Sequence, residues 1–199
     1  MRGAVWLLLL AGCDFTFNLD YINPVDATAI DTSADTFNPD MCPIGYDVSL
    51  YPGSKFRIIT ATMKAWDASD DCTNDLDGAT HLAAALTRDK LDVLIGALTV
   101  RMQAYWWIGA VQPTNVSLPI ERWVWTTGEP VDPTMWDSPV EPNDGNGIED
   151  DHRDQFAMIG MNKPGLADVN GDSLQLALCE CDGRPLADDA KAAIDQSRF

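Results

Sequence analysis

Basic residues are scarce in this chain of 199 residues. Thirteen Lys and Arg stand against 31 Asp and Glu, which gives a formal net charge of −18 at pH 7. Such a charge repels the phosphate backbone of nucleic acids and the anionic surface of membranes. We therefore expect no nucleic-acid partner. The excess of carboxylates favours either cation binding or simply high solubility.

Motifs typical of enzymes are also missing. The sequence has no Gly-x-Ser-x-Gly nucleophile elbow, no phosphate-binding loop and no His-Glu-x-x-His zinc motif. Only two histidines are present: we expect His81 to be a packed structural residue and His152 to lie in a solvated loop. The carboxylates of the acidic stretch 138–151 lack the apolar setting that raises the pKa of a general acid. The sequence therefore predicts a protein that is not an enzyme.

The apolar run at the N-terminus, Ala4 to Ala11, is far too short to cross a bilayer. It has the length of a signal-peptide core, and it ends in Leu-Ala-Gly-Cys, which resembles a bacterial lipobox. The resemblance implies a signal peptide at 1–12, lipid on Cys13 and an acidic tether over 13–41. We expect an exported protein, at the cell surface or in the periplasm, that contacts a bacterial membrane only through its lipid anchor.

The five cysteines leave four once Cys13 is assigned to lipid: Cys42, Cys72, Cys179 and Cys181. Four cysteines permit three pairings, and export favours disulfides. Cys179 and Cys181 are two residues apart in a predicted strand, so they point the same way and do not bridge each other readily. Each is expected to reach back to Cys42 or Cys72, and this argument leaves open which pairs with which. Zinc is disfavoured, because Cys-x-Cys has the wrong spacing.

Hydrophobic patterns predict regular elements from residue 42 onward. Strands are expected at 46–51, 54–60, 105–111, 155–161 and 174–181, and helices at 61–75, 87–104 and, as a short peripheral element, 185–196. Thr87 is the expected N-cap of the second helix. Residues predicted to face the core are Met63, Trp66 and Cys72 on the first helix and Leu91, Leu94, Ile95, Leu98 and Met102 on the second.

Residues 111–171 carry mainly loop signals, and a long loop inside a domain is usually functional. Several tryptophans could form a platform for a ligand, but core packing is their more common role. We expect such packing for Trp106, Trp107, Trp123, Trp125 and Trp136.

The order of these elements and seven short motifs resemble the C-type lectin-like domain. The motifs are Cys-Pro-Ile-Gly-Tyr at 42–46, Trp66 with Cys72, Gly-Ala-Thr-His-Leu at 78–82, Trp-Ile-Gly-Ala at 107–110, the tryptophan-rich run 123–136, Glu-Pro-Asn at 141–143 and Leu-Cys-Glu at 178–180. The resemblance implies an α+β fold over 42–182, with two helices flanking small antiparallel sheets and a long loop region. A polar tail, 183–199, would follow.

The resemblance also implies two disulfides, Cys72 with Cys179 and Cys42 with Cys181. It further implies a calcium-dependent site for mannose, glucose or fucose at Glu141-Pro142-Asn143. There the side chains that hold the metal also bind two vicinal equatorial hydroxyls, and the proline is cis. Glu141 offers only acceptors and Asn143 offers an amide donor, an order that suits mannose-type sugars.

The remaining metal ligands are less well matched to the family. The next glutamate of its pattern falls on Glu149, although the length of the loop leaves the position open among Glu149, Asp150, Asp151 and Asp154. The family has Trp-Asn-Asp before the last strand, where this chain has Leu-Ala-Asp at 166–168. Asp168 is retained, but Ala167 cannot bind metal or sugar, and Asn170 is the expected substitute because it alternates with Asp168 as in calcium loops.

The predicted function is therefore calcium-dependent carbohydrate binding, with Glu141, Asn143 and Glu149 contacting the sugar. The predicted calcium ligands are Glu141, Asn143, Glu149, Asp168 and Asn170. The alternative is a protein-binding or structural module of the same fold, in which calcium is at most structural. The two differ over Ala167: placement of Asn170 in the missing ligand position favours the first, and its absence there favours the second.

Overall fold

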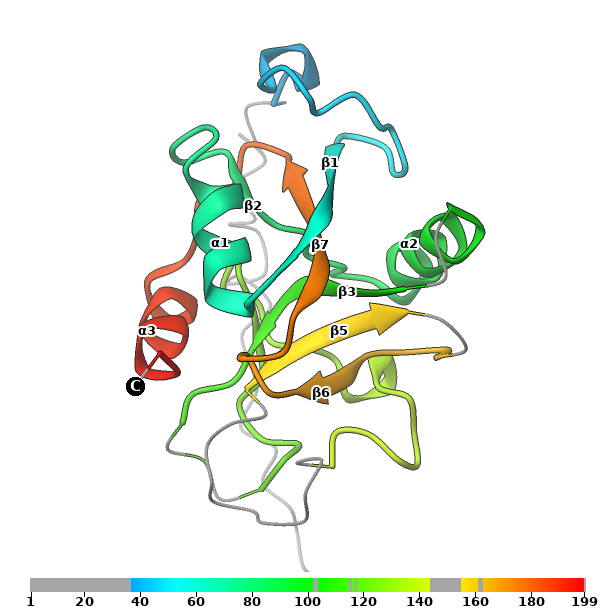
Figure 1. Cartoon of the computed structure of the whole chain (residues 1–199), viewed down its shortest axis with the longest axis vertical. Coiled ribbons are helices and arrows are strands. Elements are labelled where there is room, and N and C mark those ends of the chain that lie inside the picture. Colours follow the sequence, from blue (N-terminus) through cyan, green and yellow to red (C-terminus); the bar gives the residue numbers. More distant parts are fainter. Residues whose placement is uncertain are drawn as a thin grey trace, which may run out of the picture. The chain divides into compact units, whose positions relative to one another are not determined.

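A mixed sheet of seven strands organises the part of the chain that the computed structural model describes, which is residues 37–101, 104–114, 116, 118–143, 155–160 and 163–198 (Figure 1). Its strands run in the order β1 (Lys55–Met63), β7 (Gln175–Cys181), β3 (Tyr105–Val111), β5 (Phe156–Gly160) and β6 (Ala167–Val169). In addition, β2 (Thr80–Leu82) pairs with β7, and β4 (Val124–Trp125) pairs with β3. Only the β3–β7 pair is parallel among the described strands.

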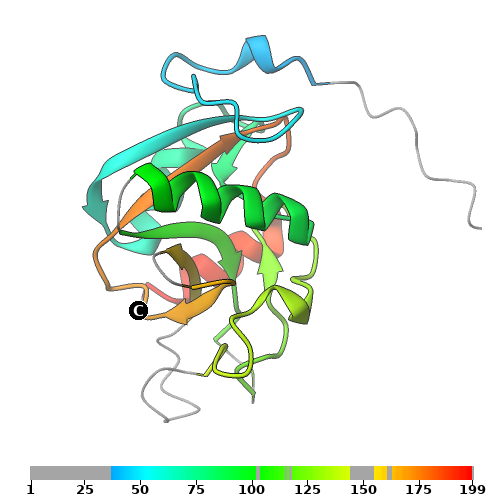
Figure 2. The same ribbon diagram turned by 90° about the vertical axis from the view of Figure 1, so that its right-hand side faces the viewer.

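Three α-helices cover the two faces of the sheet (Figures 1 and 2). The buried side chains of α2 (Arg88–Arg101) share one apolar cluster with Trp106 and Ile108 of β3. Those of α1 (Ala65–Thr73) and α3 (Asp188–Gln196) share the other with Trp107. Successive side chains of a strand point to opposite faces, so β3 supplies both cores. Two 3-10 turns, η2 (Pro39–Met41) and η3 (Pro133–Met135), complete the elements.

The helix α2 forms where its sequence pattern predicts. The Oγ1 of Thr87 accepts a hydrogen bond from the backbone N–H of Lys90 at 3.3 Å, as expected of an N-cap. Leu91, Leu94 and Leu98 are buried against the sheet, which matches the predicted apolar face.

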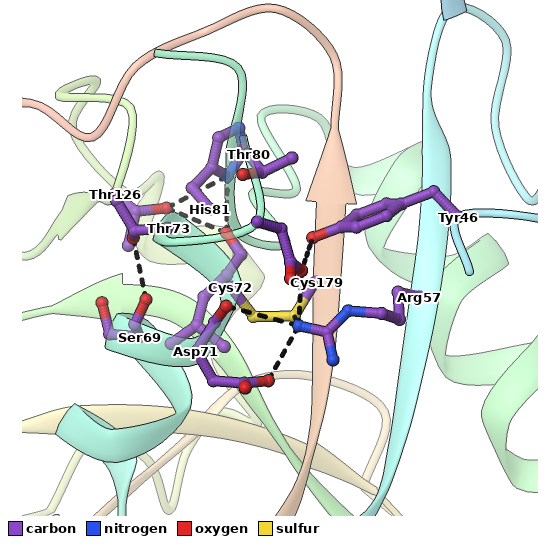
Figure 3. The surroundings of a disulfide bond; sticks show 12 residues. Tyr46, Arg57, Ser69, Asp71, Cys72, Thr73, Thr80, His81, Thr126 and Cys179 are labelled. Atoms are coloured by element: carbon purple, nitrogen blue, oxygen red, sulfur yellow. Dashed lines mark hydrogen bonds and ion pairs between the residues drawn. A yellow bond between two sulfur atoms is a disulfide. The ribbon is translucent and has the colours of Figure 1, made fainter. Parts of the chain in front are cut away.

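Two disulfides connect β7 to the rest of the domain, in the pairs that the family resemblance implied. Cys72–Cys179 joins α1 to β7 (Figure 3), and Cys42–Cys181 joins the segment after η2 to the end of the same strand. Beside the first disulfide, Arg57 of β1 donates a hydrogen bond of 2.8 Å to Asp71 of α1. The start of the described chain is thereby fixed to its C-terminal strand.

Two predicted elements are wrong. Residues 46–51 do not form a strand; only Val48 bridges to Phe56, at the beginning of β1. The helix predicted at 61–75 begins at Ala65, because β1 continues to Met63, which pairs with Gln175 of β7. Two short strands, β4 and β6, lie inside the region that was predicted as loop.

The C-terminal segment packs more closely than a peripheral tail would. Ala190, Ala193 and Ile194 of α3 are buried in the same cluster as Trp107. Residues 36–199 form one compact unit, and within its described part the α+β architecture is confirmed. No helix among the described residues has the length and apolar character needed to cross a membrane.

Candidate functional site

The predicted ligand site lies on the segment that follows η3. Hydrogen bonds between Leu166 N–H and Met135 O (2.8 Å) and between Asp137 N–H and Leu166 O (2.9 Å) hold this segment against the strand β6. A Cβ at Gly165 would come within 2.5 Å of Met135 O, so the close approach requires glycine at this position. Asp137 O then accepts from Glu141 N–H at 3.1 Å, which turns the chain back.

Three of the predicted site residues meet in this turn. The amide Nδ2 of Asn143 donates to Oε2 of Glu141 at 2.6 Å, and Asn143 N–H donates to Oδ1 of Asp168 at 3.0 Å. The Glu141–Pro142 peptide bond is cis, as the resemblance implied, and so is Ser138–Pro139. Asp168 is on β6, so the sheet positions one carboxylate behind the Glu141–Asn143 pair.

The other predicted ligands do not join this group among the described residues. Glu149 and its alternatives at 150, 151 and 154 lie outside them, as do Cys13 and His152. The Oδ1 of Asn170 accepts the backbone N–H of Asp172 at 2.8 Å, in the turn that follows β6. Ala167 is buried and contributes a methyl group where the family has an amide. The expected substitution of Asn170 for that amide stays a prediction.

Lys163 belongs to this group, and the sequence analysis did not identify it. Its Nζ lies 2.8 Å from Oε1 of Glu141 and 3.3 Å from Oδ2 of Asp137. The only other base between Arg122 and Arg184 is Arg153, so a lone lysine within an acidic region was the available signal. We name Asp137, Glu141, Asn143, Lys163 and Asp168 the Glu141 cluster.

Burial governs the electrostatics of the Glu141 cluster. The Glu141 side chain is only 8% exposed. Burial, together with the neighbouring Asp168 carboxylate, raises the pKa of Glu141 to about 7, although Lys163 acts in the opposite direction. The expectation that the carboxylates of 138–151 lack a setting that raises their pKa is therefore wrong for Glu141, which burial sets apart. The hydrogen bond to Glu141 raises the pKa of Lys163, so the lysine stays charged at neutral pH.

Within the part of the chain that the structure describes, the Glu141 cluster alone does not complete a calcium site. Calcium prefers six to eight oxygen ligands. Carboxylate oxygens of Glu141 and Asp168 both accept hydrogen bonds from Asn143, but the Lys163 ammonium already faces Glu141, and an ammonium and a dication repel each other. Among the described residues, the cation beside Glu141 is thus the ammonium of Lys163, whereas the sequence predicted a metal ion there.

A second group of potential ligands combines His81 of β2, Glu180 of β7 and Asp182, which directly follows β7, with ligand atoms within 4.8 Å of one another. These atoms already have partners: Glu180 accepts from Lys90 at 2.5 Å and from Ala84 N–H at 3.0 Å. His81 Nε2 lies 3.0 Å from Asp182 Oδ1, and its Nδ1 lies 2.7 Å from Leu82 O. Both ring nitrogens therefore serve hydrogen bonds, and His81 has the structural role that the sequence predicted.

The tryptophans are part of the packing and do not form a platform beside Glu141. Trp123 and Trp136 are each 3% exposed, and their rings meet edge to face with centroids 4.6 Å apart. Trp106, Trp107 and Trp125 are fully buried. Exposed apolar surface next to the site comes instead from Val140, which is 58% exposed.

Comparisons with known proteins identify the fold. No protein-family model matches the sequence, and no match was found among curated proteins. The structure resembles the carbohydrate-recognition domain of a human scavenger receptor C-type lectin, with 18% identity and a TM-score of 0.57 over 71% of this chain and 98% of that one. It also resembles the C-type lectin CEL-I from Cucumaria echinata, with 14% identity and a TM-score of 0.56 over 70% and 96% of the two chains.

A calcium-independent type II antifreeze protein is similar to the same degree, with 23% identity and a TM-score of 0.53 over 70% of this chain and 92% of that one. The fold is thus the C-type lectin-like fold, as the motifs predicted, and the names of these neighbours are those of lectins and an antifreeze protein, not of enzymes. Lectins and a protein that works without calcium share this fold.

Proposed function

We propose that this domain is a carbohydrate-binding module whose binding site is built on the Glu141–Asn143 pair. The observation that carries the proposal is the pairing of an acceptor with a donor: Asn143 Nδ2 lies 2.6 Å from Glu141 Oε2, and Asn143 is exposed. Two such groups side by side match two vicinal hydroxyls of a sugar, one donating to the carboxylate and one accepting from the amide. The lectin names of several structural neighbours support the same ligand class.

The order of the two groups favours mannose-type sugars. Glu141 precedes Asn143 on the chain, which is the order that the sequence motif associates with mannose, glucose or fucose. Asp168 accepts the backbone N–H of Asn143 at 3.0 Å and so fixes the amide relative to the sheet. A site with a fixed donor and acceptor distinguishes sugars by the direction of their hydroxyls, because a wrong epimer cannot pair with both groups at once.

Calcium dependence stays a prediction. The Nζ of Lys163 lies 2.8 Å from Oε1 of Glu141, one of the two proposed recognition groups. Whether calcium strengthens sugar binding is therefore a question for titration, with metal and chelator as separate arms.

The test is calorimetric titration of mannose and of galactose into the purified protein, once with calcium and once with chelator. We expect saturable mannose binding in at least one arm, with a dissociation constant of about 1 mM as is common for a single weak site. The double variant Glu141→Gln with Asn143→Asp exchanges donor and acceptor and should reverse the preference toward galactose. Absence of heat with both sugars in both arms would rule out the proposal.

A protein-binding role is the second candidate, and two observations favour it. Ala167 removes one metal and sugar ligand of the family pattern, and Asn170 is engaged by Asp172 in its own turn. Val140 places an exposed apolar side chain beside the Glu141 cluster, which suits a protein partner. If neither sugar binds in the titration, this second candidate becomes the preferred function.

We also propose that the chain is anchored to a membrane by lipid on Cys13.

A further inference from the structure

Lys163 makes contacts that a surface lysine does not usually make. Its ammonium bridges two carboxylates from the same turn, Asp137 and Glu141, at 3.3 and 2.8 Å. The lysine is 26% exposed, Asp137 is 19% exposed and Glu141 is 8% exposed. The charges are thus largely shielded from water, and their attraction is much less screened than in an exposed pair.

The backbone delivers Lys163 to this place. Lys163 N–H donates to Gly160 O at 3.2 Å, which ties the Lys163 backbone to the end of β5. Gly165 then permits the following residues to approach the Met135–Asp137 backbone, where any side chain would collide. The Lys163 backbone is therefore held between the end of β5 and the Met135–Asp137 segment, within reach of Asp137 and Glu141.

We propose that the Lys163 ammonium is the resident cation of the Glu141 cluster, which keeps the Asp137–Asn143 turn in its folded shape without a metal and competes with calcium for Glu141. The inference rests on the site of the proposed function and adds which cation neutralises its carboxylates. One cation among three carboxylates leaves the cluster negative when all are ionised. The cluster therefore still attracts a divalent ion, but Glu141 can coordinate that ion only when the Lys163 ammonium moves away.

Two consequences follow for measurements without sugar. Removal of the ammonium should destabilise the protein when metal is absent, because Asp137 and Glu141 then face each other without a counter-charge. The same change should strengthen calcium binding, because the competing charge is gone. A lysine that only decorates the surface would produce neither effect.

The experiment compares Lys163→Met with Lys191→Met, which removes the same charge from an exposed position on α3. Thermal unfolding is followed in chelator and in a calcium series up to about 10 mM, well above the affinities usual for extracellular calcium sites. We expect Lys163→Met to melt several degrees below Lys191→Met in chelator, and to bind calcium at least about tenfold more tightly than the wild type. Lys163→Arg, which retains the charge, should behave like the wild type in both respects.

Two results would overturn the inference. Equal melting temperatures of Lys163→Met and Lys191→Met in chelator would show that the ammonium holds nothing in place. A destabilised Lys163→Met that calcium neither binds nor rescues would show an ordinary ion pair with no relation to a metal position. If Lys163→Met does not fold in chelator, refolding it with calcium decides the matter: recovery supports the inference, and failure in both conditions overturns it.

The outcome is separable from that of the proposed function. Neither readout involves sugar, so a protein that binds no carbohydrate can still show the effect of Lys163 on stability and on calcium affinity. Conversely, sugar binding in chelator by both the wild type and Lys163→Met, with unchanged stability, would support the function and refute the resident cation.

Discussion

Asp182 is a residue whose ionisation contributes to the stability of the folded domain. Its Oδ1 lies 3.0 Å from His81 Nε2, and its Oδ2 accepts from Arg184 Nε at 2.7 Å. Burial disfavours its charge, but the hydrogen bond from His81 and the charges of His81 and Arg184 prevail and hold the pKa of Asp182 well below its usual range. In the unfolded chain the pKa of an Asp is about 3.9, so on acidification Asp182 is protonated in the unfolded chain before it is protonated in the folded domain.

We predict that Asp182→Asn lowers the free energy of unfolding at pH 7 by about 2 kcal/mol, the usual range for a buried hydrogen bond to a charged group. This stabilisation is fully present above about pH 5 and is lost as the pH falls below about 4, so the gap to the wild type should shrink there. Urea unfolding at several pH values measures it. Asp47→Asn, at an exposed position, is the control with the same charge change. A gap that stays constant from pH 7 to pH 2 would contradict the prediction.

At the residue scale, the sequence could place Glu141 and Asn143 in the site because a tripeptide motif carries both. It could not place Lys163, whose contact with Glu141 spans 22 residues and depends on the register of β5 and β6. It predicted Asp168 as a calcium ligand from the Leu-Ala-Asp sequence; the structure places Asp168 beside Asn143, and its role as a ligand stays a prediction. A contact between residues of one short motif can be predicted from the sequence, whereas a contact between two turns can be predicted only when the fold is known.

At the element scale, the strand β7 is held by both disulfides, and they should differ in their effect. Their sequence separations are 139 and 107 residues, and because loop-closure entropy varies with the logarithm of loop length, the two links differ by only a few tenths of a kcal/mol in this respect. The difference lies in the native state. Cys72 and Cys179 are both completely buried between α1 and β7, whereas Cys42 is partly exposed.

We therefore predict that replacing Cys72 and Cys179 together by alanine costs about 4 kcal/mol or more, and that replacing Cys42 and Cys181 costs less. Under a mild thiol reductant, Cys42–Cys181 should open first, because the attacking thiolate can reach Cys42. Urea unfolding of the two double variants measures the first effect, and mass spectrometry of alkylated cysteines over time measures the second. Earlier alkylation of Cys72 and Cys179 would show that burial does not protect the link.

The same scale explains which elements could be predicted. The helix α2 has a cap and a long apolar period, and these signals agree with each other. The residues 61–63 have no such agreement: the strand reaches Met63 because Met63 pairs with Gln175 of β7, and a chain segment before a helix offers no local sign of that partner. The strands β4 and β6 are too short, at two and three residues, for any alternation to be recognised.

At the scale of the whole molecule, one site per chain constrains the biology of the proposed function. A single sugar site of this kind binds weakly, and tight attachment to a glycan requires many copies on one surface. A lipid anchor on Cys13, followed by the acidic tether 13–41, would supply such an array without any contact between the domains. The net charge of −18 of the whole chain would hold such anchored copies away from one another and from anionic lipid.

This repulsion makes the final prediction sharp. Because the charged domain has no electrostatic affinity for anionic lipid, attachment to the membrane should rest on Cys13 alone. In a bacterial host, we expect the wild type to fractionate with membranes and to incorporate a labelled fatty acid, and Cys13→Ser to lose both properties. Asp14→Ser, which changes the neighbouring residue and keeps the cysteine, should retain them. Membrane association that survives in Cys13→Ser would mean that another part of the chain holds the protein there, and the array argument for weak sugar sites would need a different anchor.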